Sequence, residues 1–150
     1  MNIEVTGSAP RLTRQEVVNF ARKVLLAAGG VGTGAPARPT AGEGARRHTE
    51  IAEISIAFVN DKAMRGLNKK FRGKNRTTDV LTFAGDNACE IVISVDRAKR
   101  QAVEERHSMA TELRYLLLHG ILHGLGYDHE TDEGEMDELE VAVREKVGLD

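Results

Sequence analysis

The sequence predicts a single α+β domain built from four strands and about five helices. The chain has 150 residues with 41% hydrophobic content, which suits one domain around one core and requires no second domain. Four short segments rich in β-branched residues and five longer segments with helical periodicity follow one another along it. No internal repeat accompanies them, so the chain is expected to fold as one unit.

The first two elements are a short strand over residues 2–6 and a helix that begins at Thr13. Thr13 and Glu16 form a capping box, in which each side chain accepts a hydrogen bond from the backbone of the other residue. Gly29 and Gly30 are expected to end this helix. Its apolar stripe consists of Val17, Phe20, Ala21, Val24 and Leu25.

A segment without apolar periodicity separates this helix from the next strand. Residues 29–48 are rich in glycine, alanine, proline and arginine, which predicts a flexible insertion that is dispensable for the chemistry. Residues 51–59 then predict a strand, and Asn60 with Asp61 caps a second helix that Gly73 ends. The apolar side of this helix carries Met64, Leu67 and Phe71.

Two further strands, at residues 79–84 and 90–95, are joined by a short turn and predict a hairpin. Asp96 can cap a charged helix that extends to about Arg106. Ser108 then opens a long helix with little polar surface, which should be the buried central helix. Its apolar residues are Leu113, Leu116, Leu117, Leu118, Ile121, Leu122 and Leu125.

Two glycines interrupt the long apolar helix. Gly120 and Gly124 each cost about 1 kcal/mol relative to alanine in a helix interior. They therefore indicate that something, either a strand or a substrate, approaches this face of the helix closely.

The charged residues are distributed unevenly, although the formal net charge is only −2. Residues 62–76 carry seven basic side chains and no acid, whereas residues 128–150 carry ten acids against Arg144 and Lys146. The acidic end contains a last helix capped at residues 132–135, with a buried stripe of Met136, Leu139, Val143 and Val147. The basic segment indicates that the protein binds a polyanion such as a nucleic acid. On charge alone, a helix face that is merely exposed to solvent explains the segment equally well.

Three histidines near the end of the long helix form the strongest functional signal. His119 and His123 are four residues apart, so a helix presents both imidazoles on one face. Gly126 accepts a left-handed conformation that turns the chain back, so that His129 can reach the same point. Three imidazole ligands with a fourth position left to water are typical of a catalytic zinc site. The alternative is that each imidazole only packs or caps.

The helix lacks the general base of the zinc proteases that share this histidine spacing. Those proteases carry glutamate directly after the first histidine, where this chain has Gly120. Glu112 lies seven residues upstream of the first histidine, about 10 Å along the helix axis, which is too far to replace that glutamate. Either the base comes from elsewhere or the substrate is not a peptide.

The N-terminal sequence and the single cysteine predict a cytoplasmic protein. No basic segment followed by a long apolar one stands at the N-terminus, so neither secretion nor membrane insertion is expected. Cys89 is alone, which excludes an internal disulfide and fits a reducing compartment. We interpret Cys89 as a small buried hydrophobe; the alternative is that it completes the metal shell and makes the site structural.

Two motifs are specific enough to indicate a family. One is His-Gly-x-Leu-His-x-x-Gly-Tyr-Asp-His at residues 119–129, and the other is Leu-Asn-x-x-Phe-Arg-Gly-Lys at 67–74 leading to Thr-Asp-Val-Leu-Thr-Phe at 78–83. Over roughly residues 51–147 the chain resembles the YbeY family of bacterial ribosomal-RNA maturation endoribonucleases. The resemblance implies a mixed four-stranded sheet and one zinc ion per chain on the three histidines. It also implies cleavage of single-stranded RNA in small-subunit (16S) rRNA maturation and ribosome quality control, with precursor rRNA, the small subunit and ribosomal or GTPase assembly proteins as partners and no membrane.

The resemblance also implies roles for the basic segment. Arg72 falls where the family keeps an arginine beside the metal, and its guanidinium could bind a phosphate through two nitrogens. Arg72 and the metal ligand His119 would then be the catalytic residues. The RNA backbone would be bound by Lys69, Lys70, Arg72, Lys74 and Arg76. The chain departs from the family pattern at Thr77, where proline is usual, and at Cys89 and Glu90, where a Gly-Asp pair is common.

Three functions remain compatible with these patterns. In the first, zinc polarises a water or a phosphoryl oxygen while Arg72 stabilises the charge that develops on the phosphate, so that RNA is cut without the missing glutamate. The second is a zinc metalloprotease-like hydrolase with a base from outside the helix, which Gly120 disfavours. The third is a non-catalytic ribosome-associated factor whose zinc is structural.

Overall fold

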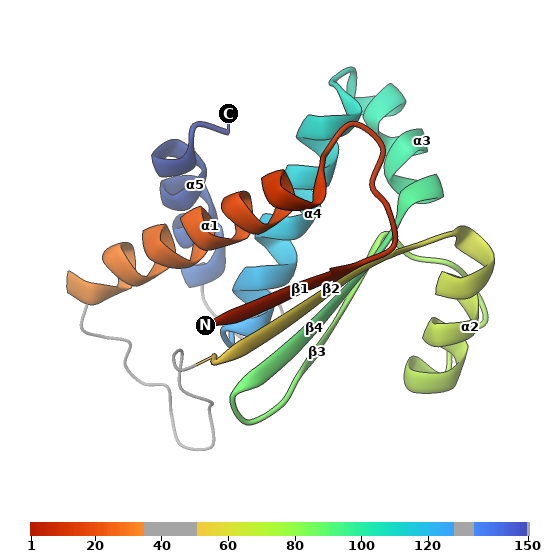
Figure 1. Ribbon diagram of the computed structural model, residues 1–150, viewed down its shortest axis with the longest axis horizontal. Coiled ribbons are helices and arrows are strands. Elements are labelled where there is room, and N and C mark those ends of the chain that lie inside the picture. Colours follow the sequence, from red (N-terminus) through yellow and green to blue (C-terminus); the bar gives the residue numbers. More distant parts are fainter. Residues whose placement is uncertain (35–50, 128–133, 150) are drawn as a thin grey trace.

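The computed structural model describes residues 1–34, 51–127 and 134–149 of the chain. Within these ranges it contains four strands and five helices, which confirms the predicted α+β class (Figure 1). They are β1 (Asn2–Thr6), α1 (Arg14–Gly34), β2 (Glu53–Val59), α2 (Asp61–Arg72), β3 (Val80–Ala84), β4 (Ala88–Ser94), α3 (Val95–Glu105), α4 (Met109–Gly124) and α5 (Glu135–Val147). None of the helices in these ranges is long and apolar enough to cross a membrane.

The four strands form one mixed sheet in the order β1-β2-β4-β3 (Figure 1). β2 pairs in parallel with both β1 and β4, whereas β3 pairs antiparallel with β4. β3 and β4 are the predicted hairpin, and the Gly85 N–H donates to the Ala88 carbonyl at 2.7 Å across its turn. β3 lies at one edge of the sheet, so one long side of this strand has no partner strand among the described residues.

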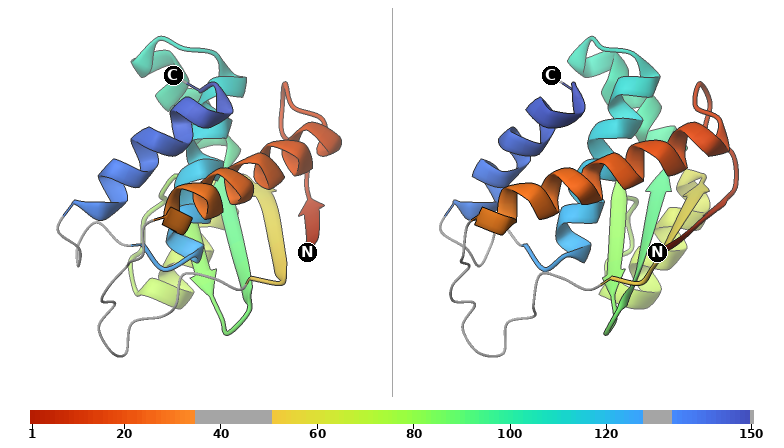
Figure 2. Two further views of the ribbon diagram at one scale, coloured as in Figure 1. Left: turned by 90° about the vertical axis from the view of Figure 1, so that its left-hand side faces the viewer. Right: turned by 60° about the vertical axis from the view of Figure 1, so that its left-hand side comes forward.

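Alternating side chains of the sheet pack into two separate clusters. Ile91 and Ile93 of β4 belong to the main core, which α1, α4 and α5 complete. Figure 2 shows these three helices gathered on the same side of the sheet. Val92 points to the opposite face, where it packs with Leu81 of β3 and Met64 of α2. The sheet therefore separates α2 from α1, α4 and α5.

Several helix ends are formed by the residues that the sequence predicts. In the capping box of α1, the Thr13 N–H donates to Glu16 Oε1 at 2.9 Å, and the Glu16 N–H donates to Thr13 Oγ1 at 3.1 Å. Asn60 caps α2, and Gly73 ends it with a φ of 71°. Ser108 caps α4. These contacts satisfy backbone groups that a helix end leaves without an intrahelical partner.

The predicted end of the first helix is wrong. α1 continues through Gly29 to Gly34. Gly29 does not adopt the positive φ of a helix-ending glycine, and its cost inside a helix, about 1 kcal/mol, is small enough for the rest of the helix to outweigh. Residues 29–34 of the predicted insertion are therefore helical, and residues 35–48 lie outside the described part of the chain.

The predicted cap of α3 is wrong, and the cap of α5 can be followed only in part. Ser94, not Asp96, caps α3 by accepting the Arg97 N–H at 3.1 Å. Asp96 instead accepts the N–H of Asp61 at 2.8 Å and so ties the first turns of α2 and α3 together. Gly134 stands at the N-cap of α5 without a side-chain hydrogen bond, and the other residues predicted to cap this helix lie mostly outside the described ranges.

Strands cover the two glycines of α4, which is one of the two alternatives that the sequence predicts. A Cβ added to Gly120 would lie 2.8 Å from Ile91 Cγ2 and 3.4 Å from Thr82 Oγ1. A Cβ added to Gly124 would overlap the sulfur of Cys89 and lie 3.3 Å from its Cβ. α4 can therefore approach β3 and β4 this closely only because both positions lack a side chain.

Candidate metal and RNA site

His119 and His123 lie on one face of α4 with their rings together, as their spacing predicts. Their Nε2 atoms are 3.1 Å apart, and their ring centroids are 4.7 Å apart. Two imidazole nitrogens that bind one zinc ion at about 2.0–2.1 Å with tetrahedral angles lie roughly 3.3 Å apart. The pair therefore fits two of the positions around such an ion.

The third predicted ligand, His129, lies outside the described residues. Gly126 adopts the predicted positive φ, at 108°, and the Tyr127 N–H donates back to the Leu122 carbonyl at 3.1 Å. These contacts turn the chain after the last turn of α4. Residues 1–34, 51–127 and 134–149 contain no group of three His, Cys, Asp or Glu side chains that could hold a metal. The described residues thus bring together two of the three predicted donors.

Arg72 shares a cleft of about 440 Å³ with the two histidines. The described residues that line it are Arg72, Asp79, Val80, Thr82, Ala84, Tyr115, Leu116, His119, His123 and Glu140. Arg72 reaches the cleft from the last turn of α2, which Gly73 closes by donating its N–H to the Lys69 carbonyl at 3.1 Å. Alternate residues of the edge strand β3 form one wall, with Asp79 just before that strand, and α4 and α5 line the cleft opposite Arg72 and β3. The guanidinium of Arg72 and the imidazoles of His119 and His123, which are far apart in the sequence, therefore line the same cleft.

The other predicted RNA-binding residues stand outside this cleft. Lys69, Lys70, Lys74 and Arg76 are exposed at the end of α2 and in the segment that follows. The Arg76 carbonyl accepts a hydrogen bond from Asn68 Nδ2 at 2.9 Å, which ties this segment back to the helix. Their placement extends positive charge outward from Arg72, and their role in binding RNA stays a prediction.

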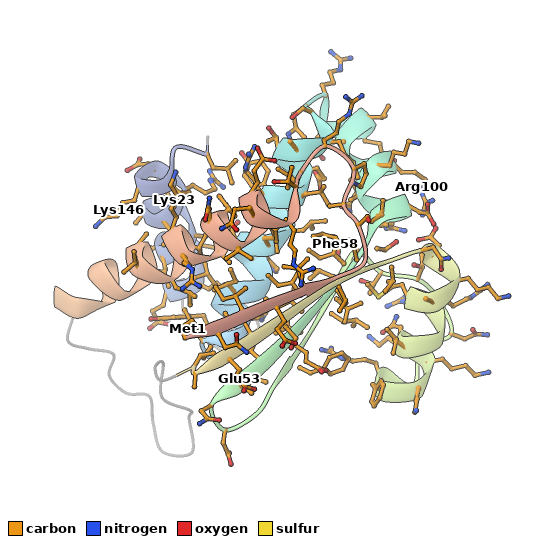
Figure 3. The ribbon with its side chains drawn as sticks, in the orientation of Figure 1. Met1, Lys23, Glu53, Phe58, Arg100 and Lys146 are labelled. Atoms are coloured by element: carbon orange, nitrogen blue, oxygen red, sulfur yellow. The ribbon has the colours of Figure 1, made fainter. Side chains whose placement is uncertain are left out.

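Asp61 anchors the segment between α2 and β3. Its Oδ1 accepts the hydroxyls of Ser94 at 2.8 Å and Thr77 at 3.0 Å, and its Oδ2 lies 2.9 Å from Arg100. Figure 3 shows Arg100 of α3 at the start of α2. Burial alone would raise the pKa of Asp61, but the two hydroxyls and the guanidinium hold this pKa below its ordinary value of 3.8. Thr77 is thus tied to the start of α2 through its side chain.

Sequence reasoning missed Glu140 of α5, which faces His119. Glu140 Oε1 lies 3.7 Å from His119 Nδ1, and Glu140 Oε2 lies 4.0 Å from Arg144 Nη1. The Arg144 guanidinium in turn lies 5.6 Å from the ring centroid of Tyr115, which also lines the cleft. The spacing of Glu140 and Arg144 on a helix was visible in the sequence. The contact with His119 was not, because it arises from the packing of α5 beside α4.

Asp79 and Thr82 also line the cleft without having been predicted as site residues. Asp79 accepts the Val80 N–H at 2.7 Å and Gln101 Nε2 at 3.1 Å. Thr82 Oγ1 donates to the Gly120 carbonyl at 3.4 Å, so it links β3 to α4. Both residues belong to the motif at 78–83, so this motif was the feature of the sequence that could have identified them as site residues.

Cys89 was considered above as a further metal ligand, and Glu112 as a replacement for the missing general base. In the structure both side chains have other neighbours. Cys89 is 2% exposed in the main core, where its sulfur faces Gly124, which agrees with its interpretation as a buried hydrophobe. Glu112 is buried as well, and its Oε1 lies 2.5 Å from His107 Nε2. Neither joins the two histidines in a metal-binding group within the described ranges.

Comparison with known proteins identifies the family of this chain. The family model described as Endoribonuclease YbeY matches residues 40–148. The curated protein of that name from Koribacter versatilis is 44% identical over 100 residues, which cover 65% of this chain and 66% of that protein. The protein of the same name from Nautilia profundicola is 45% identical over 102 residues, which cover 65% of this chain and 73% of that protein. The one from Moorella thermoacetica is 39% identical over 153 aligned positions, which cover 90% of this chain and 89% of that protein.

A solved structure shows the same fold. The solution structure of a protein from Thermotoga maritima matches with a TM-score of 0.58 and 22% sequence identity, over 97% of this chain and 89% of that one. At this identity the likeness concerns the fold alone. The family model, which covers well over half of the chain, and the Moorella relative, which aligns along nearly all of it, carry the assignment. The chain belongs to the YbeY family of endoribonucleases.

Proposed function

We propose that this chain is a zinc-dependent endoribonuclease that cuts single-stranded RNA. The observation that carries the proposal is that Arg72 lines the same cleft as His119 and His123. A guanidinium binds phosphate through two parallel hydrogen bonds, and paired imidazoles suit a zinc ion. Membership of the family supports the same reaction, since the relatives are named endoribonucleases.

The donor set fits a zinc ion, one per chain. His119 and His123 would hold it through their Nε2 atoms, with His129 as the third ligand. When bound, the ion supplies a Lewis acid that activates a water or polarises a phosphoryl oxygen. Arg72 would bind the scissile phosphate, and its permanent charge would stabilise the negative charge that grows on the phosphate oxygens.

We propose precursor rRNA of the small subunit (16S) as the substrate, during its maturation and in ribosome quality control in the cytoplasm. The exposed Lys69, Lys70, Lys74 and Arg76 would bind successive phosphates without reading the sequence. The small subunit and ribosomal or GTPase assembly proteins would be the partners. Gly120, which stands where zinc proteases have their general base, disfavours a peptide substrate.

Removal of the metal is expected to abolish cleavage. Purified protein is incubated with a labelled small-subunit rRNA precursor in three forms: untreated, treated with a chelator, and chelated with zinc restored. We expect cutting in the first and third samples only. Cutting that persists in a protein shown to hold no metal would contradict the proposal. So would a fully metallated protein that cuts an unfolded protein substrate but not RNA, or that cuts neither.

Replacing Glu140 with glutamine is expected to weaken zinc binding by roughly 10- to 100-fold. A carboxylate that accepts a hydrogen bond from the second nitrogen of a metal-binding histidine orients the ring and raises the basicity of the ligating nitrogen. Glu140 Oε1 lies 3.7 Å from His119 Nδ1, within ion-pair distance, and would take this role when the ring binds the metal. Glutamine keeps the size of the side chain but is a weaker acceptor. Competition with a chromophoric chelator measures the affinity directly, without any assay of activity.

Glu138→Gln is the matched control, because Glu138 is exposed on the same helix and does not line the cleft. This control should bind zinc as tightly as the unmodified protein. Equal affinities for Glu138→Gln and Glu140→Gln would show that Glu140 does not act on His119.

A further inference from the structure

We infer that Phe71 is a stacking platform for an unpaired nucleobase of the RNA whose phosphate Arg72 binds; the inference rests on the proposed function. Phe71 directly precedes Arg72 in the last turn of α2. All four phenylalanines and both tyrosines of the chain lie in the described ranges, and Phe71, at 54%, is the one that is exposed. The sequence placed Phe71 on the apolar side of its helix, but the structure leaves about half of this residue exposed.

Phe83 packs against the Phe71 ring. The two ring centroids are 5.2 Å apart and the ring planes meet at 65°, which is an edge-to-face contact. Phe83 is partly buried and packs on the cluster of Met64, Leu81 and Val92 on the α2 face of the sheet. An aromatic ring that is anchored before binding loses little freedom when a ligand stacks on it.

Basic residues flank Phe71 in its helical turn, and one of them lies over its ring. Lys70 Nζ lies 5.3 Å from the ring centroid of Phe71, and Lys69 and Arg72 belong to the same helical turn. Residues 62–76 contain no acid. A nucleotide whose base stacks on Phe71 would therefore bring its phosphate next to cations. Aromatic rings set among basic side chains are typical of sites for single-stranded nucleic acids.

The edge strand β3 connects this ring to the cleft. Successive residues of a strand point to opposite faces of a sheet. Thr82 lines the cleft, whereas Phe83 packs against Phe71 on the other face. An RNA strand that crosses this edge would place one phosphate at Arg72 and a neighbouring base on Phe71. Since both faces of a base are covered in a duplex, this contact selects unpaired bases.

The test separates base stacking from attraction between charges. Two single-stranded probes of equal length and charge are used, an oligoadenylate and its abasic counterpart, both with 2′-O-methyl groups so that the 2′-oxygen cannot attack. We expect the unmodified, zinc-loaded protein to bind the oligoadenylate more tightly than the abasic strand, by roughly 10- to 100-fold. Phe71→Ala should lose this preference and bind the abasic strand as before.

A fluorescent variant gives an independent readout. The chain contains no tryptophan, so Phe71→Trp introduces a single indole at the proposed platform. Its emission should be quenched by the oligoadenylate and not by the abasic strand. Val103→Trp, at a 75% exposed position of α3, is the matched control and should be quenched by neither. Thermal unfolding of each variant establishes that it is folded.

Three results would overturn the inference, and each leads to a different conclusion about the protein. If Phe71→Ala keeps the preference for the base-bearing strand, Phe71 is only a cover for the cluster beneath it, and the proposed ribonuclease stands. If the unmodified protein binds neither probe and cuts no RNA, the proposed function fails as well. If the Phe71→Trp emission responds to an unstructured peptide and not to the oligoadenylate, the ring belongs to a protein-binding surface.

Discussion

Replacing Arg72 with alanine is expected to lower kcat/KM for cleavage of single-stranded RNA by roughly 100- to 1000-fold. Arg72 is the only residue with a permanent positive charge among the described residues that line the cleft. Its guanidinium would donate two parallel hydrogen bonds to two phosphate oxygens. The attraction would grow as negative charge develops on these oxygens in the transition state. The loss should therefore fall mainly on kcat, while the affinity for zinc stays unchanged.

Two further variants decide how Arg72 acts. Arg65→Ala removes the same charge from an exposed position of α2 that does not line the cleft, so it should lower kcat/KM only slightly. Arg72→Lys keeps the charge but loses the planar fork, and an intermediate rate is expected. The rates are compared on a labelled single-stranded RNA under identical salt, because charge effects are screened. Similar losses for Arg65→Ala and Arg72→Ala would mean that Arg72 contributes only to the overall positive field.

The features that the sequence predicts correctly depend on short-range physics. The capping box of Thr13 and Glu16 and the cap of Asn60 form within three residues along the chain, so they are readable without tertiary structure. The approach of His119 to His123 likewise follows from the period of one helix. The resemblance carried by the motif at 67–83 implied that Arg72 would lie near the predicted metal ligands, and Arg72 lines the same cleft as His119 and His123, while its role and theirs stay predictions.

The features that the sequence does not predict depend on how elements pack. Glu140 meets His119 only because α5 lies beside α4, and no local pattern encodes that contact. Ser94 takes the cap of α3 because β4 runs directly into the helix, whereas Asp96 is drawn to the backbone of α2. The exposure of Phe71 has the same origin, since its hydrophobicity and helical phase equal those of a buried residue. Tertiary context decides each of these cases.

Replacing Gly124 with alanine is expected to lower the free energy of unfolding by roughly 1–3 kcal/mol. Alanine is the better helix former by about 1 kcal/mol, so helix propensity alone predicts the opposite sign. The added Cβ would overlap the sulfur of Cys89, a residue that β4 holds in the main core. Urea unfolding measured with a chelator present excludes any contribution from metal binding. Gly66→Ala is the matched control: nothing lies within 4 Å of a Cβ at this position of α2, so this variant should gain roughly 0.5–1 kcal/mol.

The overlap with Cys89 makes a second substitution decisive. Cys89→Ala removes the sulfur, so in its presence Gly124→Ala should cost much less, and the two changes should be strongly non-additive. If Gly124→Ala costs the same with and without that sulfur, contact with β4 is not what requires the glycine. Gly124 directly follows His123, and Gly120 directly follows His119, so each of the two predicted ligands stands next to a point where α4 touches the sheet. Arg72 and the edge strand line one side of the cleft and the imidazoles of α4 line another, so a shift of α4 away from the sheet would change the distance between the guanidinium and the imidazoles. A variant that relieves the overlap by moving α4 outward should therefore lose cleavage even where it still folds and still binds zinc.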